Sequence, residues 1–349
     1  MIAIIGAGLS GLLLAYRFKN ANIPFKVLEA RKRIGGRIHT LKGAHKTPME
    51  MGATWFHQEH RHFLHLLSEL DIPFYEQYMD GTAFFQAHAG VPAESFIMPD
   101  QTPSYRIAGG TIELINKLKS GLDEKDIFLD QPVHEIDFSK NEVRVEARET
   151  FMAEKVILAL PPKLWQKTIR FSPDLPSNVK QIAGETQTWM EESIKVGVIY
   201  DKPFWRQNHQ SGTLFSNVGP MTELYDHCNQ EVSAFALCGF LHSNFRSLTP
   251  EERKRRVIQQ LTSSFGREAS EALDYVELDW SIEAHTSGPL SRPLFPHQNN
   301  GHEIFQNSLC EDRLYFAGTE VSPHHGGYME GAVYNSMQVF AKILRYTKK

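Results

Sequence analysis

Four residues near the start of the chain have the types and spacing needed to hold a dinucleotide. Gly6, Gly8 and Gly11 form a Gly-x-Gly-x-x-Gly pattern between an apolar run and a helical pattern. In that context the glycines permit a tight turn, close approach to a pyrophosphate and close helix packing. Glu29 lies where a carboxylate accepts hydrogen bonds from ribose hydroxyls. A glycine-rich turn without a ligand is the alternative, and the complete pattern argues against it.

The loop after Glu29 adds a second set of cationic groups. Residues 30–37 read Ala-Arg-Lys-Arg-Ile-Gly-Gly-Arg. The Arg-x-Gly-Gly-Arg core from Arg33 to Arg37 places two guanidinium groups and two flexible backbone units just beyond the ribose carboxylate. Such groups suit a long, bent pyrophosphate ligand. The glycine pattern alone is compatible with NAD or FAD, and this loop favours FAD over the alternative of a solvated basic loop.

Lys195 is the other residue whose position suggests chemistry. It lies between Ile194 and Val196 in an apolar, strand-like run. A lysine is costly to bury there unless it has partners or a chemical role. The alternative is an exposed lysine on an alternating strand.

Short strands and amphipathic helices must position these groups. Ile2–Ile5, a helix through about Lys19 and Phe25–Glu29 form one strand–helix–strand unit. Apolar runs predict further strands over 133–136, 143–147, 156–160 and 314–317, and helical periodicity predicts helices over 57–70, 110–118 and 331–344. Residues 72–107 show no regular pattern. The pieces of a nucleotide-binding fold therefore come from both chain ends and the middle.

Longer sequence blocks carry a resemblance to one family. They are 6–11, 29, 33–37 and 50–55; 107–110, 133 and 156–162; 195–200 and 203–206; and 313–320 and 327–332. With these blocks the sequence resembles the flavin monoamine oxidase and polyamine oxidase family over most of its length. The resemblance implies an α/β fold: a Rossmann-like, glutathione-reductase-type FAD-binding domain with an inserted α+β substrate domain. The expected FAD-binding domain comprises 1–75, 107–163 and 286–349, and the substrate domain 76–106 and 164–285.

The resemblance also implies roles for individual residues. The matching lysine, Lys195, would contact a water beside flavin N5, and Tyr328 would form one wall of an aromatic cage that orients a neutral amine. Both are expected to be catalytic. The expected cofactor-binding residues are Gly6, Gly8, Ser10, Gly11, Glu29, Ala30, Arg31, Gly36, Arg37, Val133, Gly318, Thr319, Glu320 and Met329.

The sequence departs from the family at two places. Alignment on Phe295-Pro296 puts Leu290 where the family has a cysteine for covalent flavin attachment, and Ser291 where it has the second cage wall. We therefore expect non-covalent FAD and an incomplete cage. The segment between Tyr75 and Arg106 is also very short where the family has a large helical insertion. We therefore expect a site that is either more open or completed by a partner subunit.

These features favour an FAD-dependent oxidoreductase that oxidises an amine CH–NH group to an imine, with O2 as the acceptor. A desaturase acting on a C–C bond of an apolar substrate, with a quinone acceptor, remains open, as does a non-catalytic flavin-binding protein. A formal net charge of −4 gives no indication of a nucleic-acid or membrane partner. The expected partner is a small molecule.

Cysteine and histidine usage adds weaker indications. Three dispersed cysteines and the lack of a long apolar stretch predict a cytoplasmic protein. His57, His60, His62 and His65 are interpreted as a solvated helix rather than a metal site. Either His324 or His325 could line the substrate cavity or pack within its loop.

Overall fold

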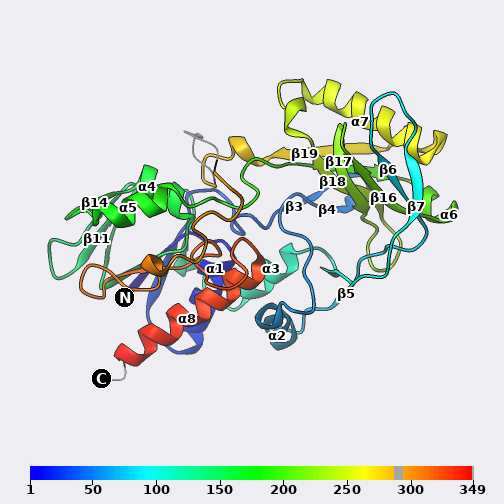
Figure 1. The fold of residues 1–349 in the computed structure, drawn as a ribbon. Coiled ribbons are helices and arrows are strands. Elements are labelled where there is room, and N and C mark those ends of the chain that lie inside the picture. Colours follow the sequence, from blue (N-terminus) through cyan, green and yellow to red (C-terminus); the bar gives the residue numbers. More distant parts are fainter. Residues whose placement is uncertain (287–293, 348–349) are drawn as a thin grey trace.

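The computed structural model describes residues 1–286 and 294–347, and its two main sheets lie at separate ends of the molecule (Figure 1). One sheet is entirely parallel, with strand order β20-β13-β1-β2-β9. Its strands are β1 (Ile2–Ile5), β2 (Phe25–Leu28), β9 (Ile127–Phe128), β13 (Lys155–Leu158) and β20 (Leu314–Phe316). Every residue of β1 is buried, as an apolar run in a central parallel strand requires.

Helices cover one face of the parallel sheet. They are α1 (Leu9–Asn20), α2 (Arg61–Glu69), α3 (Ile112–Ser120) and α8 (Met329–Thr347). The first and last helices of the chain pack together, with the Phe18 and Phe340 rings 5.5 Å apart. The two chain ends therefore share one hydrophobic core.

A small sheet and two helices cover the opposite face. The sheet has the order β12-β11-β10-β14, and its core is shared with the parallel sheet. Its elements are β10 (Glu135–Asp137), β11 (Val143–Glu146), β12 (Thr150–Ala153) and β14 (Arg170–Ser172), with α4 (Pro162–Thr168) and α5 (Ser177–Gly184). Trp165 of α4 stacks on Phe316 of β20 at 5.5 Å.

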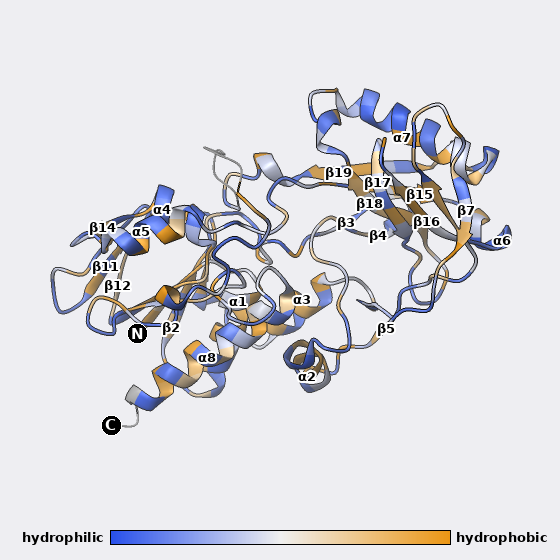
Figure 2. Ribbon diagram, in the orientation of Figure 1, coloured by the Kyte–Doolittle hydropathy of each residue, from blue (hydrophilic) through white to orange (hydrophobic). Residues whose placement is uncertain are grey.

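The second main sheet is mixed and has seven strands, in the order β19-β15-β18-β17-β16-β6-β7. Its strands are β6 (Thr82–Gln86), β7 (Glu94–Ile97), β15 (Ile194–Tyr200), β16 (Gln210–Ser216), β17 (Met221–Asp226), β18 (Phe235–Leu241) and β19 (Asp274–Asp279). Helix α7 (Pro250–Phe265) covers one face, and Figure 2 shows hydrophilic residues along much of this helix over apolar strands. A short helix, α6 (Phe204–Gln207), follows β15.

Alternation along β15 separates two environments. Ile194, Val196 and Val198 pack in the core beneath α7. Ile199, which projects from the opposite face of the strand, packs against the hairpin of β3 (Thr40–Lys42) and β4 (Pro48–Glu50). Because side chains alternate between the faces of a strand, Lys195 projects on the hairpin side, away from α7.

The mixed α/β architecture expected from the sequence is confirmed, and the differences are local. The predicted helices over 57–70 and 331–344 occupy 61–69 and 329–347, and the predicted strand over 133–136 occupies 135–137. The segment 72–107, whose sequence shows no regular pattern, contains four short strands. In that segment β6 and β7 extend the seven-stranded sheet, and β5 (Phe74–Glu76) pairs with β8 (Tyr105–Ile107). Within the described residues, no helix is long and apolar enough to cross a membrane.

Candidate active site

One continuous cavity of about 1420 Å³ runs between the two main sheets. This volume exceeds that of an ordinary small-molecule pocket, so the cavity can hold a large cofactor together with a substrate. All but one of the site residues expected from the sequence line it: Gly6, Gly8, Ser10, Glu29, Ala30, Arg31, Gly36, Arg37, Val133, Lys195, Gly318, Thr319, Glu320, Tyr328 and Met329. The exception, Gly11, lies outside the lining.

The three glycines of the first turn have different environments. Gly6 has φ +106°, a left-handed conformation that favours glycine. A Cβ on Gly11 would lie 1.9 Å from Gly6 O, so Gly11 lets α1 pack against the turn. A Cβ on Gly8 would meet only Gly36 Cα, at 3.8 Å. Gly8 therefore leaves open space where a phosphate could approach the backbone.

The Glu29 carboxylate lies at the end of β2 and is 4% exposed. Its oxygens accept hydrogen bonds from Ala7 N at 2.8 Å and Arg31 N at 2.9 Å. The Arg31 side chain is held by Glu283 at 3.1 Å and by the Thr286 hydroxyl at 2.6 Å. A fixed carboxylate on the cavity wall, beside the glycine turn, has the chemistry needed to accept from a ribose.

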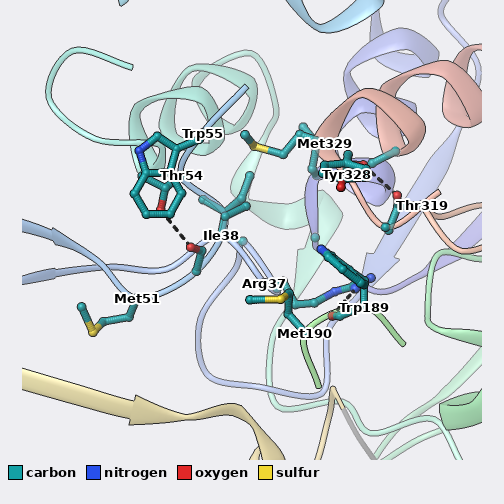
Figure 3. Close-up of a pocket in the computed structure, with 18 of the residues that line it drawn as sticks. Arg37, Ile38, Met51, Thr54, Trp55, Trp189, Met190, Thr319, Tyr328 and Met329 are labelled. Atoms are coloured by element: carbon teal, nitrogen blue, oxygen red, sulfur yellow. Dashed lines mark hydrogen bonds between the residues drawn. The ribbon is translucent and has the colours of Figure 1, made fainter. Parts of the chain in front are cut away.

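Arg37 and Glu320 join the two halves of the expected cofactor site. The Arg37 guanidinium binds both oxygens of Glu320, at 2.5 and 2.8 Å, and Glu320 is 1% exposed. Arg37 also donates to Trp189 O at 3.3 Å. Nearby, the Thr319 hydroxyl donates to Tyr328 O at 2.7 Å (Figure 3). These bonds connect the Gly-Gly-Arg loop, the segment before β15 and the start of α8.

Lys195 is buried on the cavity wall, with 2% of its surface exposed. Its ammonium donates to Gly52 O at 2.7 Å and to the Thr54 hydroxyl. It also lies 4.7 Å from the centre of the Trp55 ring and 5.4 Å from that of Phe240. Burial lowers the pKa of Lys195. The exposed-lysine alternative is therefore wrong.

Charged and titratable groups lie behind Lys195, away from solvent. Burial raises the pKa of Glu50, which accepts from Thr111 N at 2.7 Å. Burial also lowers the pKa of His227 well below its usual value, with Arg106 as a further cause. The Glu50 carboxylate partly offsets the effect of burial on the Lys195 ammonium.

Rings from three other segments lie near Tyr328, those of His60, Trp189 and His297. Trp189 lies 6.0 Å and His297 5.9 Å from its ring centre, and Trp189 stacks on His297 at 4.1 Å. Figure 3 shows Trp189 on the same side of the cavity as Tyr328. Trp189 and His297 were not predicted from the sequence, because no local pattern indicates contacts between residues so far apart in the chain. Leu290 and Ser291 lie outside the described residues.

His60 corrects the interpretation of the histidine cluster. It is 3% exposed rather than solvated, and its ring lies 5.1 Å from His325 and 5.7 Å from Tyr328. Burial lowers the pKa of His60, with His325 as the next cause. His62, in contrast, is held by Glu330 at 2.7 Å. Across residues 1–286 and 294–347, no group of three or more His, Cys, Asp or Glu could hold a metal.

A glycine turn, a buried carboxylate at the end of the second strand and a buried lysine, all on one cavity, define a dinucleotide-dependent oxidoreductase site. The sequence matches the family described as flavin containing amine oxidoreductase over residues 9–91 and 85–339. The chain belongs to this family, which implies a flavin cofactor. The open backbone at Gly8 and the buried Glu29 fit that cofactor.

Named relatives agree with this assignment. Human amine oxidase [flavin-containing] B is 24% identical, over 98% of this chain and 86% of that protein. That alignment extends over 453 positions, so the human protein has segments that this 349-residue chain lacks. A putrescine oxidase structure with bound putrescine has a TM-score of 0.86 at 22% identity, covering 99% of this chain and 98% of that one. The Brevibacterium oxydans cyclohexylamine oxidase has a TM-score of 0.87 at 20% identity, covering 100% and 99%.

Proposed function

We propose that this protein oxidises an amine at the carbon next to nitrogen, and that the imine product then hydrolyses. FAD would accept the hydride equivalent and would be reoxidised by O2 with formation of peroxide. The observation that carries the proposal is Lys195, a buried cation on the wall of the cavity that the glycine turn opens into. Relatives that oxidise amines support it.

Lys195 can hold a water and a charge at the reacting centre. Gly52 O and the Thr54 hydroxyl take two of its three N–H donors among the described residues. The third can bind a water in the cavity. A fixed positive charge in a buried site also stabilises negative charge that develops beside it.

The same cation selects the protonation state of the substrate. An ammonium group next to Lys195 would be disfavoured by like-charge repulsion and by burial. The reacting amine is therefore expected to bind in its neutral form, with its nitrogen lone pair free. Tyr328 and Trp189 provide aromatic surface against which the substrate carbon can pack.

We propose that FAD is bound without a covalent link to cysteine. The chain has three cysteines: Cys228 and Cys238 are buried, and Cys310 is partly buried. None of them lines the cavity. Residues 1–75, 107–163 and 286–349 would form the FAD-binding domain, and 76–106 and 164–285 the substrate domain. Release of free flavin on acid precipitation would support non-covalent binding.

Anaerobic flavin absorbance tests the proposed function. Purified protein with bound FAD is mixed with amines, polyamines and amino acids in the absence of oxygen. Bleaching by an amine, reversed by admitting air with formation of peroxide, is the expected result. Bound flavin that no amine bleaches would refute amine oxidation. Bleaching that only a quinone reverses would refute O2 as the acceptor.

A further inference from the structure

A second, much smaller cavity of about 10 Å³ adjoins the main one, and Thr54 lines both. This volume is close to the space that one water molecule occupies, and a buried water needs two to four polar partners. The side chains of Glu50, Thr54 and Arg106 line the small cavity and provide such partners. The small cavity is therefore suited to a single water, next to the hydroxyl that holds Lys195.

Glu50 is the one carboxyl group among the described residues that line the small cavity. It lies at the end of β4 and is 2% exposed. Its Oε1 accepts from Thr111 N at 2.7 Å and from the Thr40 hydroxyl at 3.0 Å, and a Cβ on Gly110 would lie 2.6 Å from it. Thr111 and Gly110 both line the small cavity. The carboxylate is thus fixed at the wall of that cavity, away from bulk solvent.

The Thr54 hydroxyl connects the small cavity to Lys195. It accepts a hydrogen bond from the Lys195 ammonium and donates one to Gly52 O at 3.1 Å. Gly52 O also accepts from the ammonium, at 2.7 Å, so it keeps a partner when the hydroxyl rotates. A hydroxyl both donates and accepts. Thr54 can therefore receive a proton from a water in the small cavity and pass one to Lys195.

Three neighbouring titratable groups do not compete with Glu50 for a proton. His227 Nε2 lies 3.4 Å from Glu50 N, and burial lowers the pKa of His227 well below its usual value, so this ring stays neutral. Burial raises the pKa of Cys238 and the pKa of Tyr75, so both groups already hold their protons. The carboxylate is therefore the group beside the small cavity that can take up a proton.

Opposing effects act on the Glu50 carboxyl. Burial raises its pKa, and the Lys195 and Arg106 cations act against that rise. Negative charge that enters the main cavity offsets these cations and so favours the protonated carboxyl. Hydride transfer to FAD brings such a charge. Reduction of the cofactor should therefore increase the affinity of Glu50 for a proton.

We propose that Glu50 stores the proton that an ammonium substrate loses on binding and returns it during the reaction with O2. This inference rests on the proposed amine oxidation, in which the neutral amine reacts. Loss of hydride from that amine leaves a cationic imine. In the O2 step two electrons pass to oxygen, together with the transferred hydrogen as one proton. The second proton of the peroxide comes from Lys195, which Glu50 reprotonates through the water and Thr54.

Proton release during anaerobic reduction tests the storage step. Holoenzyme in weak buffer at neutral pH, with a pH indicator, is reduced by an amine that bleaches the flavin. The wild type should release almost no protons, because Glu50 retains the one that the ammonium loses. Glu50→Gln keeps an oxygen acceptor for Thr111 N and should release a full proton for each flavin reduced. Infrared difference spectra should show a new carboxylic acid band in the reduced wild type that is absent from Glu50→Gln.

Glu113→Gln is the matched control, because Glu113 is an exposed carboxylate in the first turn of α3 and lines neither cavity. It should behave as the wild type does. Release of a full proton by the wild type, or equal release by the wild type and Glu50→Gln, would overturn the storage role. The measurement on the wild type decides this even if Glu50→Gln does not fold.

Two substitutions of Thr54 test the path. Thr54→Val removes the hydroxyl at similar volume and should slow flavin reoxidation by O2 at least about tenfold, whereas Thr54→Ser should keep the wild-type rate. Equal rates in Thr54→Val and Thr54→Ser would overturn the path. Failure of every amine to reduce the flavin would instead refute the proposed function, and Glu50 would then have no proton to store.

Discussion

Replacing Lys195 with methionine separates its chemical role from its structural one. Methionine keeps an unbranched apolar stem but removes the ammonium. The substitution leaves two former acceptors, Gly52 O and the Thr54 hydroxyl. These can pair with each other, because the Thr54 hydroxyl donates to Gly52 O at 3.1 Å. The substitution also removes the cost of burying a charge. We therefore expect the free energy of unfolding at neutral pH to fall by less than about 1 kcal/mol, or to rise.

The pH dependence of stability gives the sign of the effect. Burial lowers the pKa of Lys195 in the folded chain, whereas in the unfolded chain its pKa is about 10.4. At pH values between the pKa of Lys195 in the folded chain and its pKa in the unfolded chain, the unfolded chain binds one proton more than the folded chain. Wild-type stability therefore rises with pH in this range. Lys195→Met lacks this contribution. Its stability relative to wild type should decline as pH rises towards about 10, as urea unfolding at several pH values can measure.

The catalytic effect should be larger than the structural one. Loss of a charge-assisted interaction in a buried site costs about 1.5–3 kcal/mol, or roughly tenfold to 150-fold in rate. Stopped-flow measurement of flavin reduction by amine and of reoxidation by O2 would show which step slows. Lys202→Met is the control, since Lys202 is exposed just beyond β15. Two results together would refute the reasoning: wild-type rates of flavin reduction and reoxidation in Lys195→Met, and a free energy of unfolding that depends on pH as it does in the wild type.

Three further substitutions test other parts of the site. Glu29→Gln should raise the FAD dissociation constant about tenfold or more, measured by flavin fluorescence on dilution, because a charged acceptor is lost; unchanged affinity would count against a ribose contact. Trp189→Ala should raise KM for amines severalfold, whereas Trp189→Phe keeps most of the aromatic packing. Burial lowers the pKa of His39 to about 4. Wild-type stability should therefore fall by up to about 3 kcal/mol as pH drops from 6.5 to 4, and His39→Gln should abolish that loss.

The sequence could predict the cofactor half of the site because its signals are local. Gly6, Gly8 and Glu29 lie within one strand–helix–strand unit, where spacing along the chain determines position in space. Lys195 could be selected because a lysine in an apolar run needs an explanation. Its burial and its hydrogen bonds to Gly52 and Thr54 provide one.

The substrate half could not be predicted, because its contacts are long-range. Trp189, His297 and Tyr328 meet only after three segments fold together. Strands β6 and β7 were missed because their segment contains several prolines and has no clear periodicity. They are strands because β6 pairs with β16, more than a hundred residues further along the chain.

The register of β15 determines which of its side chains pack in the core and which face the cavity. Ile194 and Val196 pack beneath α7, and this alternation places Lys195 on the opposite face, towards the cavity. A slip of one residue would press the lysine into that core and move apolar side chains to the cavity. Pairing through Phe240 fixes Glu223 on the cavity face in the same way. The hydrophobic pattern that stabilises the sheet therefore also determines which polar side chains face the cavity.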